Sequence, residues 1–378
     1  MIQNNLPGSS VDFLVLFFYN CAHGWKGDGM DRIRKIWSRR LHYAFNLAVT
    51  AVLLGGGGNS ALAAESVELK LAHFMSPLHI QHQESFLPFA QNVEKLTQGW
   101  VRIKVYAGGA LGGPMQMPDA VRTGITDMAF IVPSYATGRF PRSSVLDLPF
   151  LSDQALKAAR IFYDLYDPYL ADDYRDYKVL WLYSSDPGQL FTVTGPVKNL
   201  EDLKGKKIRS PSAAMSTALG LLGAHPVSMP ISELHSALDK RVIDGMLAPT
   251  TAIHDFNLYD QIRYGTRINM FSSLLMVVMN KERFASLPDF ARKSLDEASG
   301  KNWGFRASGI YDRLDADVMA KLKASGRVLL ETISTAERQR FLERLKPMEA
   351  DWAVHQADRH IPANDILTAM HAAMTGNP

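Results

Sequence analysis

The chain has 378 residues, of which 47% are hydrophobic and 21% are charged. This is an ordinary globular composition, and the length is sufficient for two packed domains. Residues 1–64 contain six of the 41 Lys and Arg residues but only three of the 38 Asp and Glu residues, which leaves 35 of each sign in the rest of the chain. The main part of the chain is therefore formally neutral, which argues against a nucleic-acid partner or a polybasic membrane contact.

The N-terminal region has the pattern of a secretory signal peptide. A basic region at 32–40 precedes an apolar stretch at 44–54, and residues 61–64 form a small-residue cleavage pattern. The apolar stretch is shorter than the roughly 20 residues that a membrane-spanning helix needs. We expect residues 1–64 to be removed and the mature chain to reside in the periplasm, without inserting into the membrane.

Residues 1–29 precede the basic region and match no part of a signal peptide, so they form an upstream extension and Met30 is a candidate for the true start. The pair Arg39 and Arg40 leaves the general secretory route and the twin-arginine route both open. The single cysteine, Cys21, lies in this extension. The mature chain would therefore have no cysteine, which excludes thiol catalysis, cysteine-metal sites and disulfides.

In the first half of the mature chain, apolar runs typical of β-strands alternate with helical patterns. This alternation predicts an α/β fold with largely parallel strands. The strands are predicted at 67–72, 101–107 and 127–132, and the helices at 79–97, 118–122 and 153–165.

A similar series follows in the second half. Residues 124–129 and 241–246 both place Asp at a helix-to-strand turn, which favours two similar α/β halves, and the helical pattern at 288–325 is long enough to span them. Further strands are predicted at 179–183, 191–194, 207–209, 245–248, 272–280 and 328–331, and further helices from Ser212, at 232–240, and at the C-terminus with Phe341, Leu345, Met348 and Trp352 on its packed face.

Ligands of open α/β sheets bind beyond the carboxyl ends of strands, so the residues that follow the predicted strands are the candidate site. They are mainly aromatic, apolar or hydroxylic, with one cation. The candidates are Phe74, His79, Val132, Ser134, Tyr135, Gln189, Phe191, Arg209, Ser212, Ala248 and Thr250.

Arg209 is the most informative of these candidates. A loop, a turn at Gly205 and a short strand place its permanent cation next to the helix that starts near Ser212. A guanidinium presents a planar fork of donors that matches a carboxylate, and the free N–H groups of a helix start add positive potential. The sequence therefore predicts an anion-binding residue here.

Other kinds of chemistry find little support. His79 and His82 have helical spacing, but no third metal ligand is spaced nearby. The chain has no Gly-x-Ser-x-Gly elbow, and the glycine run at 108–113 lacks the Lys-Ser/Thr ending of a phosphate-binding loop. We expect no catalytic residues, no metal and no cofactor.

Ordered motifs occupy 108–113, 120–128, 138–141, 146–151, 200–209 and 237–245. Together they resemble the solute-binding proteins of tripartite ATP-independent periplasmic (TRAP) transporters, of the DctP type. This resemblance implies two α/β lobes joined by crossing strands and a long spanning helix, a small organic acid as ligand, and a membrane permease as partner. It also implies that Arg209, which ends the motif Lys-Gly-Lys-Lys-Ile-Arg, forms a bidentate salt bridge with the ligand carboxylate.

The resemblance also implies lobe boundaries. Lobe I is expected to comprise 65–186 and 275–316, and lobe II 187–274 and 317–378. A second arginine, an asparagine and a glutamate that such proteins often carry are replaced here by Gln189, Ala248 and Val132. Because a second buried carboxylate without a partner would be costly, we expect a monocarboxylate with an apolar or aromatic body.

Two alternatives remain open from the sequence. A secreted α/β enzyme acting on a carboxylate would need a nucleophile and a base that converge on Arg209. A receptor that passes its ligand signal to a sensor kinase could use the same binding lobes. Turnover assays would identify the enzyme, and genomic neighbours would separate transport from signalling.

Overall fold

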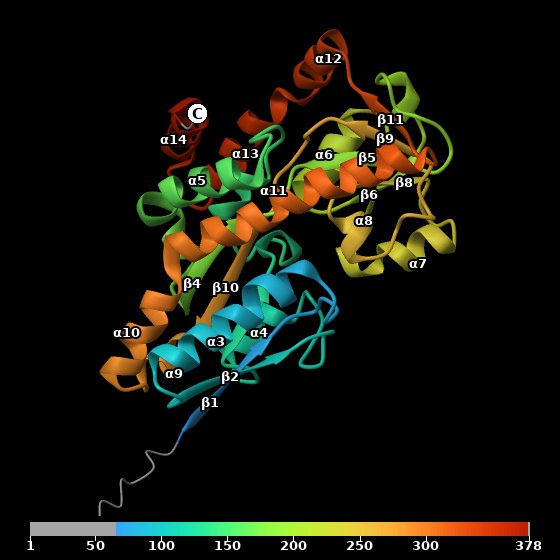
Figure 1. The fold of residues 1–378 in the computed structure, drawn as a ribbon. Helices are drawn as coiled ribbons and strands as arrows, with labels where there is room; N and C mark the ends of the chain where they lie inside the picture. The colour runs from blue at the N-terminus through green and yellow to red at the C-terminus, as the bar shows by residue number, and fades with distance from the viewer. Residues whose placement is uncertain (1–65, 377–378) are drawn as a thin grey trace, which may run out of the picture. The chain divides into compact units, whose positions relative to one another are not determined.

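The computed structural model describes residues 66–376 (Figure 1). The predicted extension, signal peptide and cleavage site, together with Cys21, lie outside the described residues. Within 66–376, no helix combines the length and apolar character needed to cross a membrane. The described part belongs to one compact unit, 65–378, in which two β-sheets are covered by helices.

The first sheet has the strand order β2-β1-β3-β10-β4. Strand β1 runs parallel to β2 and β3, with Val67 opposite Val101, whereas β10 runs antiparallel to β3 and β4. The strands are β1 (Val67–Ala72), β2 (Val101–Tyr106), β3 (Met128–Ile131), β4 (Tyr177–Ser184) and β10 (Leu274–Asn280), and the helices associated with them include α3 (Leu87–Leu96), α4 (Met117–Arg122), α5 (Ala155–Leu165) and α9 (Lys281–Ala285).

The second sheet has the strand order β11-β9-β5-β8-β6-β7, and β5 runs antiparallel to β8 and β9. The sequence did not predict β7 or β9. The strands are β5 (Gly188–Thr192), β6 (Lys207–Ser210), β7 (His225–Ser228), β8 (Gly245–Pro249), β9 (Tyr264–Arg267) and β11 (Leu329–Thr332), and the helices include α6 (Ala213–Leu221), α7 (Leu234–Asp239) and α8 (Ala252–Asp255).

Two adjacent chain segments connect the sheets. One leads from β4 to β5 and the other from β9 to β10, and they are joined by hydrogen bonds from Ser185 N to Ser273 O (3.2 Å) and from Gly188 N to Phe271 O (2.8 Å). A side chain at Gly188 would collide with the Phe271 ring, so the close approach requires glycine. The expectation of largely parallel strands is wrong for β5 and β10, because a strand that enters from the other sheet needs no helical crossover.

The long spanning helix is present, but it is divided. The predicted helix at 288–325 consists of α10 (Asp289–Ala298) and α11 (Gly300–Ser325), which are separated where Gly300 has φ +77°. Helix α11 packs against β4 and α5 near its start, while Leu314, Val318 and Leu322 join the core of the second sheet. It therefore spans both sheets, as Figure 1 shows.

The C-terminal helix predicted from Phe341 to Trp352 is in fact two helices, α12 (Thr335–Leu345) and α13 (Pro347–Ala357), because Pro347 has no N–H to continue the first one. A further helix, α14 (Ala363–Gly376), packs against α5. The predicted division assigns 317–378 to lobe II, whereas the structure places α14 against an element of lobe I. The other lobe boundaries stay predictions.

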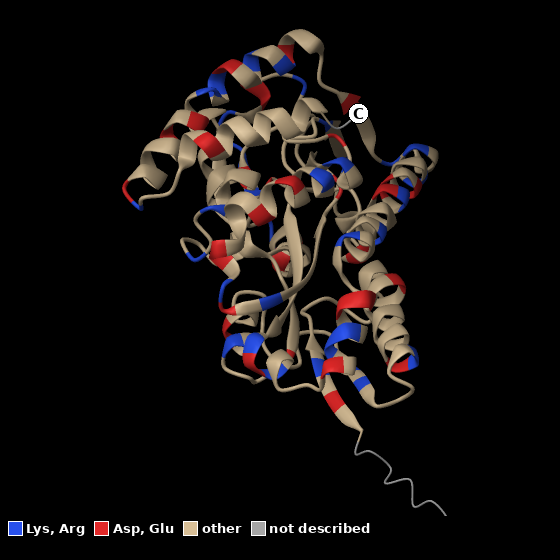
Figure 2. Cartoon of the chain, turned by 90° about the vertical axis from the view of Figure 1, so that its left-hand side faces the viewer, with Lys and Arg blue, Asp and Glu red and all other residues tan. Residues whose placement is uncertain are grey.

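Charged residues of both signs are distributed over the outer helices, and the central strands carry few of them (Figure 2). This distribution agrees with the formal neutrality of the chain after residue 64.

Candidate functional site

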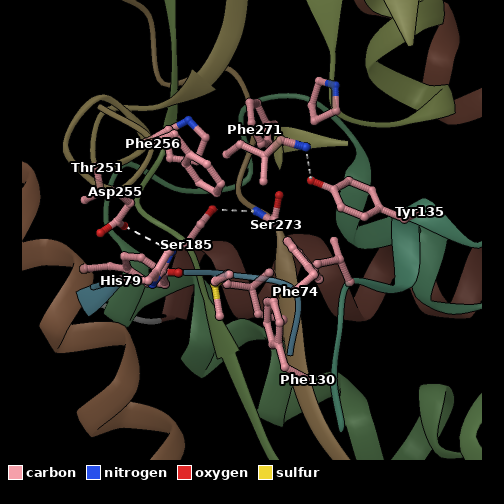
Figure 3. Close-up of a pocket in the computed structure, with 18 of the residues that line it drawn as sticks. Phe74, His79, Phe130, Tyr135, Ser185, Thr251, Asp255, Phe256, Phe271 and Ser273 are labelled. Carbon is pink, nitrogen blue, oxygen red and sulfur yellow. Dashed lines mark hydrogen bonds and ion pairs between the residues drawn. The ribbon is translucent and has the colours of Figure 1, made fainter. Parts of the chain in front are cut away.

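A cavity lies where the two sheets approach each other, beside the connecting segments (Figure 3). The empty space between its side chains, including the opening to solvent, is about 520 Å³. The cavity volume that a water-sized sphere can enter is about 50 Å³, which is below the usual range for small-molecule sites. The cavity is lined from both sheets, by residues that include Phe74, His79, Val132, Tyr135 and Ser185 on one side and Arg209, Ile231, Thr251, Asp255 and Phe256 on the other.

Arg209 reaches this cavity from β6. Arg209 is 1% exposed. Three of its N–H groups donate to protein acceptors: Nε donates to Met229 O (3.0 Å), one terminal nitrogen to Leu247 O (3.0 Å), and the other to Tyr135 Oη (3.3 Å). A guanidinium has five N–H groups. Each terminal nitrogen therefore retains one hydrogen without a protein partner among the described residues.

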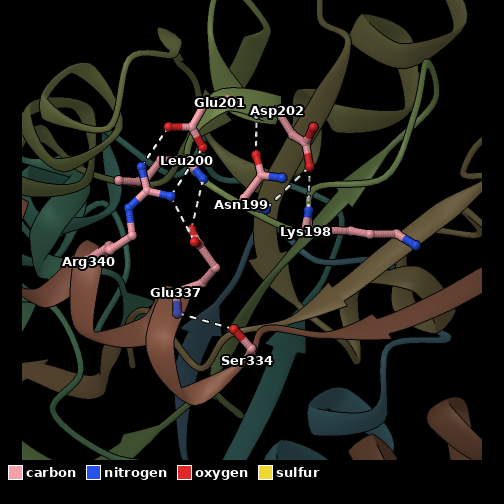
Figure 4. A network of polar contacts seen from close by, with 8 residues as sticks. All are labelled: Lys198, Asn199, Leu200, Glu201, Asp202, Ser334, Glu337 and Arg340. Carbon is pink, nitrogen blue, oxygen red and sulfur yellow. Dashed lines mark hydrogen bonds and ion pairs between the residues drawn. The ribbon is translucent and has the colours of Figure 1, made fainter.

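The segment that leads into β6 is anchored to α12 (Figure 4). Arg340 pairs with Glu201 (2.6 Å) and Glu337 (2.7 Å), and Glu337 also accepts from the backbone N of Leu200 (3.3 Å). On the other side, Asp202 accepts from the backbone N of Lys198 (2.8 Å). These contacts fix the loop before β6 and thereby help to set the position of Arg209.

Within residues 66–376, no carboxylate lies within ion-pair distance of Arg209, and Glu233 attracts its charge from farther away. Burial lowers the pKa of Arg209 from its ordinary value, although the group remains a cation at any working pH. A buried charge without a counter-ion is costly, and the cost is recovered when an anion binds beside it. The cavity end at Arg209 therefore carries a positive charge.

Tyr135 adds a donor at the same end. Its hydroxyl oxygen accepts hydrogen bonds from Arg209 and from the backbone N of Ile231 (3.1 Å). Neither of these partners can accept, so the phenolic hydrogen is available for an acceptor in the cavity. Because Tyr135 follows β3 of the first sheet and both donors lie in or just after strands of the second, this contact also connects the two sheets at the cavity.

The other end of the cavity carries an acid. His79 Nδ1 accepts from the backbone N of Gln81 (3.1 Å), so its Nε2 carries the hydrogen and donates to Asp255 Oδ2 (3.2 Å). Asp255 Oδ1 accepts from the backbone N of Ile80 (3.2 Å). Burial lowers the pKa of His79 to about 3 and raises that of Asp255 to about 7. His79 is therefore neutral and does not neutralise Asp255.

Aromatic rings form much of the wall between these ends. Phe74 lies between Phe130 (5.3 Å between ring centroids) and Tyr135 (6.3 Å), and the Phe256 ring is edge-on to His79 (5.9 Å). Phe271 from the second connecting segment completes this wall. Such surfaces favour a flat apolar ligand body, because burying its surface is favourable and needs no polar partner.

The structure brings five of the sequence-predicted residues together in this lining. They are Phe74, His79, Val132, Tyr135 and Arg209. Six others lie elsewhere. Ser134 lines a separate cavity beside α13, Gln189, Phe191 and Thr250 line a small cavity next to Asp315, Ser212 caps α6, and Ala248 is buried within β8.

Gln189 is the most instructive of the displaced residues. Its Oε1 accepts from the backbone N of Ile268 (2.7 Å) and of Asn269 (3.0 Å), and its Nε2 donates to Asn269 Oδ1 (2.6 Å) and Pro187 O (3.1 Å). The side chain points from β5 to the other connecting segment. It holds the two connections together rather than facing the cavity.

Local structure also accounts for the remaining displaced residues. Ser212 Oγ accepts from the backbone N of Met215 (3.2 Å), as an N-cap does. Phe191 and Ala248 both lie in strands of the second sheet, and their side chains join a hydrophobic core cluster of that lobe. Alternation along a strand directs such side chains away from the cavity.

Sequence reasoning missed several residues of the lining. Asp255 lies at the end of α8, beyond the loop positions that the strand-end rule selects. Ser273 precedes a strand instead of following one, and Tyr311 comes from the long helix. A broader search of the helix after β8 could have found Asp255, whereas no local pattern distinguishes Ser273 or Tyr311.

The described residues contain no group of three or more His, Cys, Asp or Glu side chains placed to hold a metal ion. His82 does not join His79 at a shared site, because its Nδ1 lies 2.8 Å from His73 Nε2. Two hydroxyls of the cavity, those of Thr251 and Ser185, already have partners. Thr251 Oγ1 lies 2.6 Å from Asp186 Oδ1, and Ser185 Oγ donates to the Asp186 carbonyl (3.0 Å).

Comparison with known proteins gives a consistent result. The model of DctP, the bacterial extracellular solute-binding protein family 7, matches residues 71–355. The 2,3-diketo-L-gulonate-binding periplasmic protein YiaO of Escherichia coli is 27% identical over 346 residues, which cover 88% of this chain and 98% of that protein.

Two solved structures share the fold closely. A TRAP solute-binding protein from Rhodoferax ferrireducens with copurified benzoate is 28% identical, with a TM-score of 0.79 over 82% of this chain and 98% of that one. A TRAP solute-binding protein from Bordetella bronchiseptica with bound (R)- and (S)-mandelate is 28% identical, with a TM-score of 0.76 over 82% and 99% of the two chains.

These relatives are solute-binding proteins of transporters and not enzymes. Their two lobes and long helix confirm the fold class that the motifs implied. The chain therefore belongs to the DctP family of extracellular solute-binding proteins, the organic-acid receptors of TRAP transporters.

Proposed function

We propose that this protein captures an organic acid with a single carboxylate and an apolar or aromatic body. Arg209 holds the carboxylate through its two unpaired N–H groups, and Tyr135 donates its phenolic hydrogen to the same group. The observation that carries this proposal is the buried Arg209 cation, which lacks a counter-ion within 66–376 and faces a cavity with aromatic walls. A bound carboxylate would supply the missing charge.

The lining disfavours ligands with two carboxylates. Arg209 is the only Arg or Lys among the residues that line the described cavity. A second carboxylate would lie in an aromatic wall or beside Asp255, and either position costs several kcal/mol for lack of a cation. The relatives crystallised with benzoate and mandelate, both aromatic monocarboxylates, support this ligand class.

The proposal also includes the cellular location of the protein and its membrane partner. The protein is exported through its N-terminal signal peptide, works in the periplasm and delivers its acid to the membrane permease of a TRAP transporter. Both connecting segments and α11 join the lobes, so closure on the ligand is a hinge motion about these elements. The contacts of Tyr135 with Arg209 and of His79 with Asp255 close the cavity from its two ends.

A thermal-shift screen tests the ligand class. Benzoate, mandelate, phenylacetate, C4-dicarboxylates and sugar acids are compared on the purified protein, after mass spectrometry has identified any acid carried through purification. We expect aromatic monocarboxylates to raise the melting temperature most, because ligand binding stabilises the folded state by mass action. Stabilisation by dicarboxylates or sugar acids alone would contradict the proposal.

A further inference from the structure

The end of the cavity opposite Arg209 contains a carboxylate whose acceptor positions are only partly used. Figure 3 shows Asp255 and His79 on the side of the cavity away from Tyr135. The Asp255 side chain is 1% exposed and accepts two hydrogen bonds, from His79 Nε2 and from the backbone N of Ile80. A carboxylate has about four lone-pair positions, so two remain.

The neighbouring groups do not use this remaining capacity. The Thr251 hydroxyl pairs with Asp186 and the Ser185 hydroxyl with a backbone carbonyl, as described above. The Tyr311 ring is edge-on to His79 (6.4 Å between centroids), and within the described residues its hydroxyl makes no hydrogen bond. At this end of the cavity, Asp255 therefore offers an acceptor, and the Tyr311 hydroxyl offers a group that can donate or accept.

His79 determines how Asp255 is presented. The bond from Gln81 N to Nδ1 fixes the tautomer in which Nε2 carries the hydrogen, so His79 can only donate to Asp255. His79 also lies between the Phe256 and Tyr311 rings, which restrict its rotation. It acts as a positioning residue, and the oxygens of Asp255 keep one orientation toward the cavity.

We propose that Asp255, positioned by His79, is a specificity-determining residue that selects acids bearing a neutral hydrogen-bond donor at the end remote from the carboxylate, such as a hydroxyl on an aromatic ring. This inference rests on the proposed function, because it takes the carboxylate to lie at Arg209. A hydroxyl there would donate to Asp255 and accept from the Tyr311 hydroxyl. A ring without it would leave the buried acid unmatched, which a hydrogen-bonding site penalises.

The test is a titration calorimetry series at pH 8 with benzoate, 3- and 4-hydroxybenzoate and the matching methoxybenzoates. The tighter-binding hydroxybenzoate isomer is expected to exceed both benzoate and its own methoxy analogue by about tenfold or more. The series requires only the unaltered protein, so it does not depend on any variant folding. Equal affinities across the series would overturn the inference.

Variants then assign the preference to Asp255. Asp255→Asn should bring the hydroxyl preference, measured as the ratio of hydroxybenzoate affinity to benzoate affinity, to within about twofold, because the acid that accepts from the hydroxyl is gone. Asp260→Asn, at an exposed aspartate five residues later, is the matched control and should keep the full preference. A preference that persists in Asp255→Asn would remove the assignment.

Two further comparisons separate the roles. His79→Ala should lower the hydroxyl preference more than the benzoate affinity, and His79→Gln, which retains a donor, should restore part of the preference. Tighter binding of 4-(aminomethyl)benzoate than of either hydroxybenzoate would overturn the inference in favour of a cationic donor. If no aromatic acid binds, or if binding survives Arg209→Ala, the proposed function itself fails, which is a distinct outcome.

Discussion

The two ends of the cavity use opposite chemistry. Arg209 is a permanent cation whose protein partners are two carbonyls and the Tyr135 hydroxyl, so its charge is left for a ligand. Asp255 is an acid whose charge burial disfavours and whose partners are a neutral histidine and a backbone N–H. We propose that the first end supplies affinity through charge and that the second supplies selectivity through hydrogen bonds.

Removing the Arg209 cation should have the largest effect on binding, because it abolishes the charge difference between the two ends of the cavity. Arg209→Ala should weaken binding of an aromatic monocarboxylate by about 2–5 kcal/mol, roughly 30-fold to several thousand-fold, because a buried charge pair is lost. Titration calorimetry measures the change. Arg327→Ala, at an arginine whose side chain is 75% exposed, is the control and should bind normally. Unchanged affinity in Arg209→Ala would refute the carboxylate clamp.

Gln189 tests whether a polar residue outside both ends contributes to binding. Gln189→Leu should reduce the free energy of unfolding by about 1–3 kcal/mol, since it leaves buried backbone donors at 268 and 269 unpaired. The rank order of ligands should not change. Chemical denaturation and a ligand screen measure the two effects, with Gln339→Leu on the exposed face of α12 as control. Altered ligand ranking with normal stability would show that Gln189 contacts the ligand after all.

The buried His73 should make the stability of the folded protein sensitive to acid. Burial, with a smaller effect from His82, lowers the pKa of His73 to about 3 from 6.5. The unfolded chain therefore takes up a proton between pH 6.5 and 3 that the folded chain does not, and stability falls as the pH falls through this window. At pH 5 the contribution of His73 is at most about 2 kcal/mol.

His73→Gln should therefore lose less stability than the unaltered protein between pH 7.5 and pH 5. The raised pKa of Asp255 acts in the opposite direction, so the comparison between variant and parent, and not the total pH dependence, isolates His73. Denaturation midpoints at both pH values give the result, with exposed His355→Gln as control. A variant as acid-sensitive as the parent would contradict the assignment.

Tyr135 should give the smallest effect. Tyr135→Phe keeps the ring that packs beside Phe74 but removes the hydroxyl that accepts from Arg209 and donates toward the cavity. We expect benzoate affinity to fall by about 1 kcal/mol, roughly fivefold, as for one hydrogen bond. Calorimetry with benzoate measures it. A loss as large as that of Arg209→Ala would mean that Tyr135 is a principal ligand contact.

Much of the fold was predictable because its elements depend on local pattern. The strands at 67–72 and 207–209 and the helix after Ser212 were expected from the spacing of apolar residues, and the structure confirms them. The antiparallel direction of β5 and β10 was not predictable, because it depends on which sheet the chain enters. The division into α12 and α13 was not predicted, because the spacing of apolar residues continues across Pro347 although the proline ends the first helix.

Sequence alone determined that this chain carries alternating α/β elements and a cation after a glycine turn, since spacing, turns and residue charge are local properties. Only the tertiary structure decided what each side chain faces. Arg209 and Tyr135 are 74 residues apart and Ile80 and Asp255 are 175 residues apart, yet both pairs bond across the same cavity. Gln189 faces the other way. Such contacts depend on strand face and lobe closure, which residue patterns do not encode.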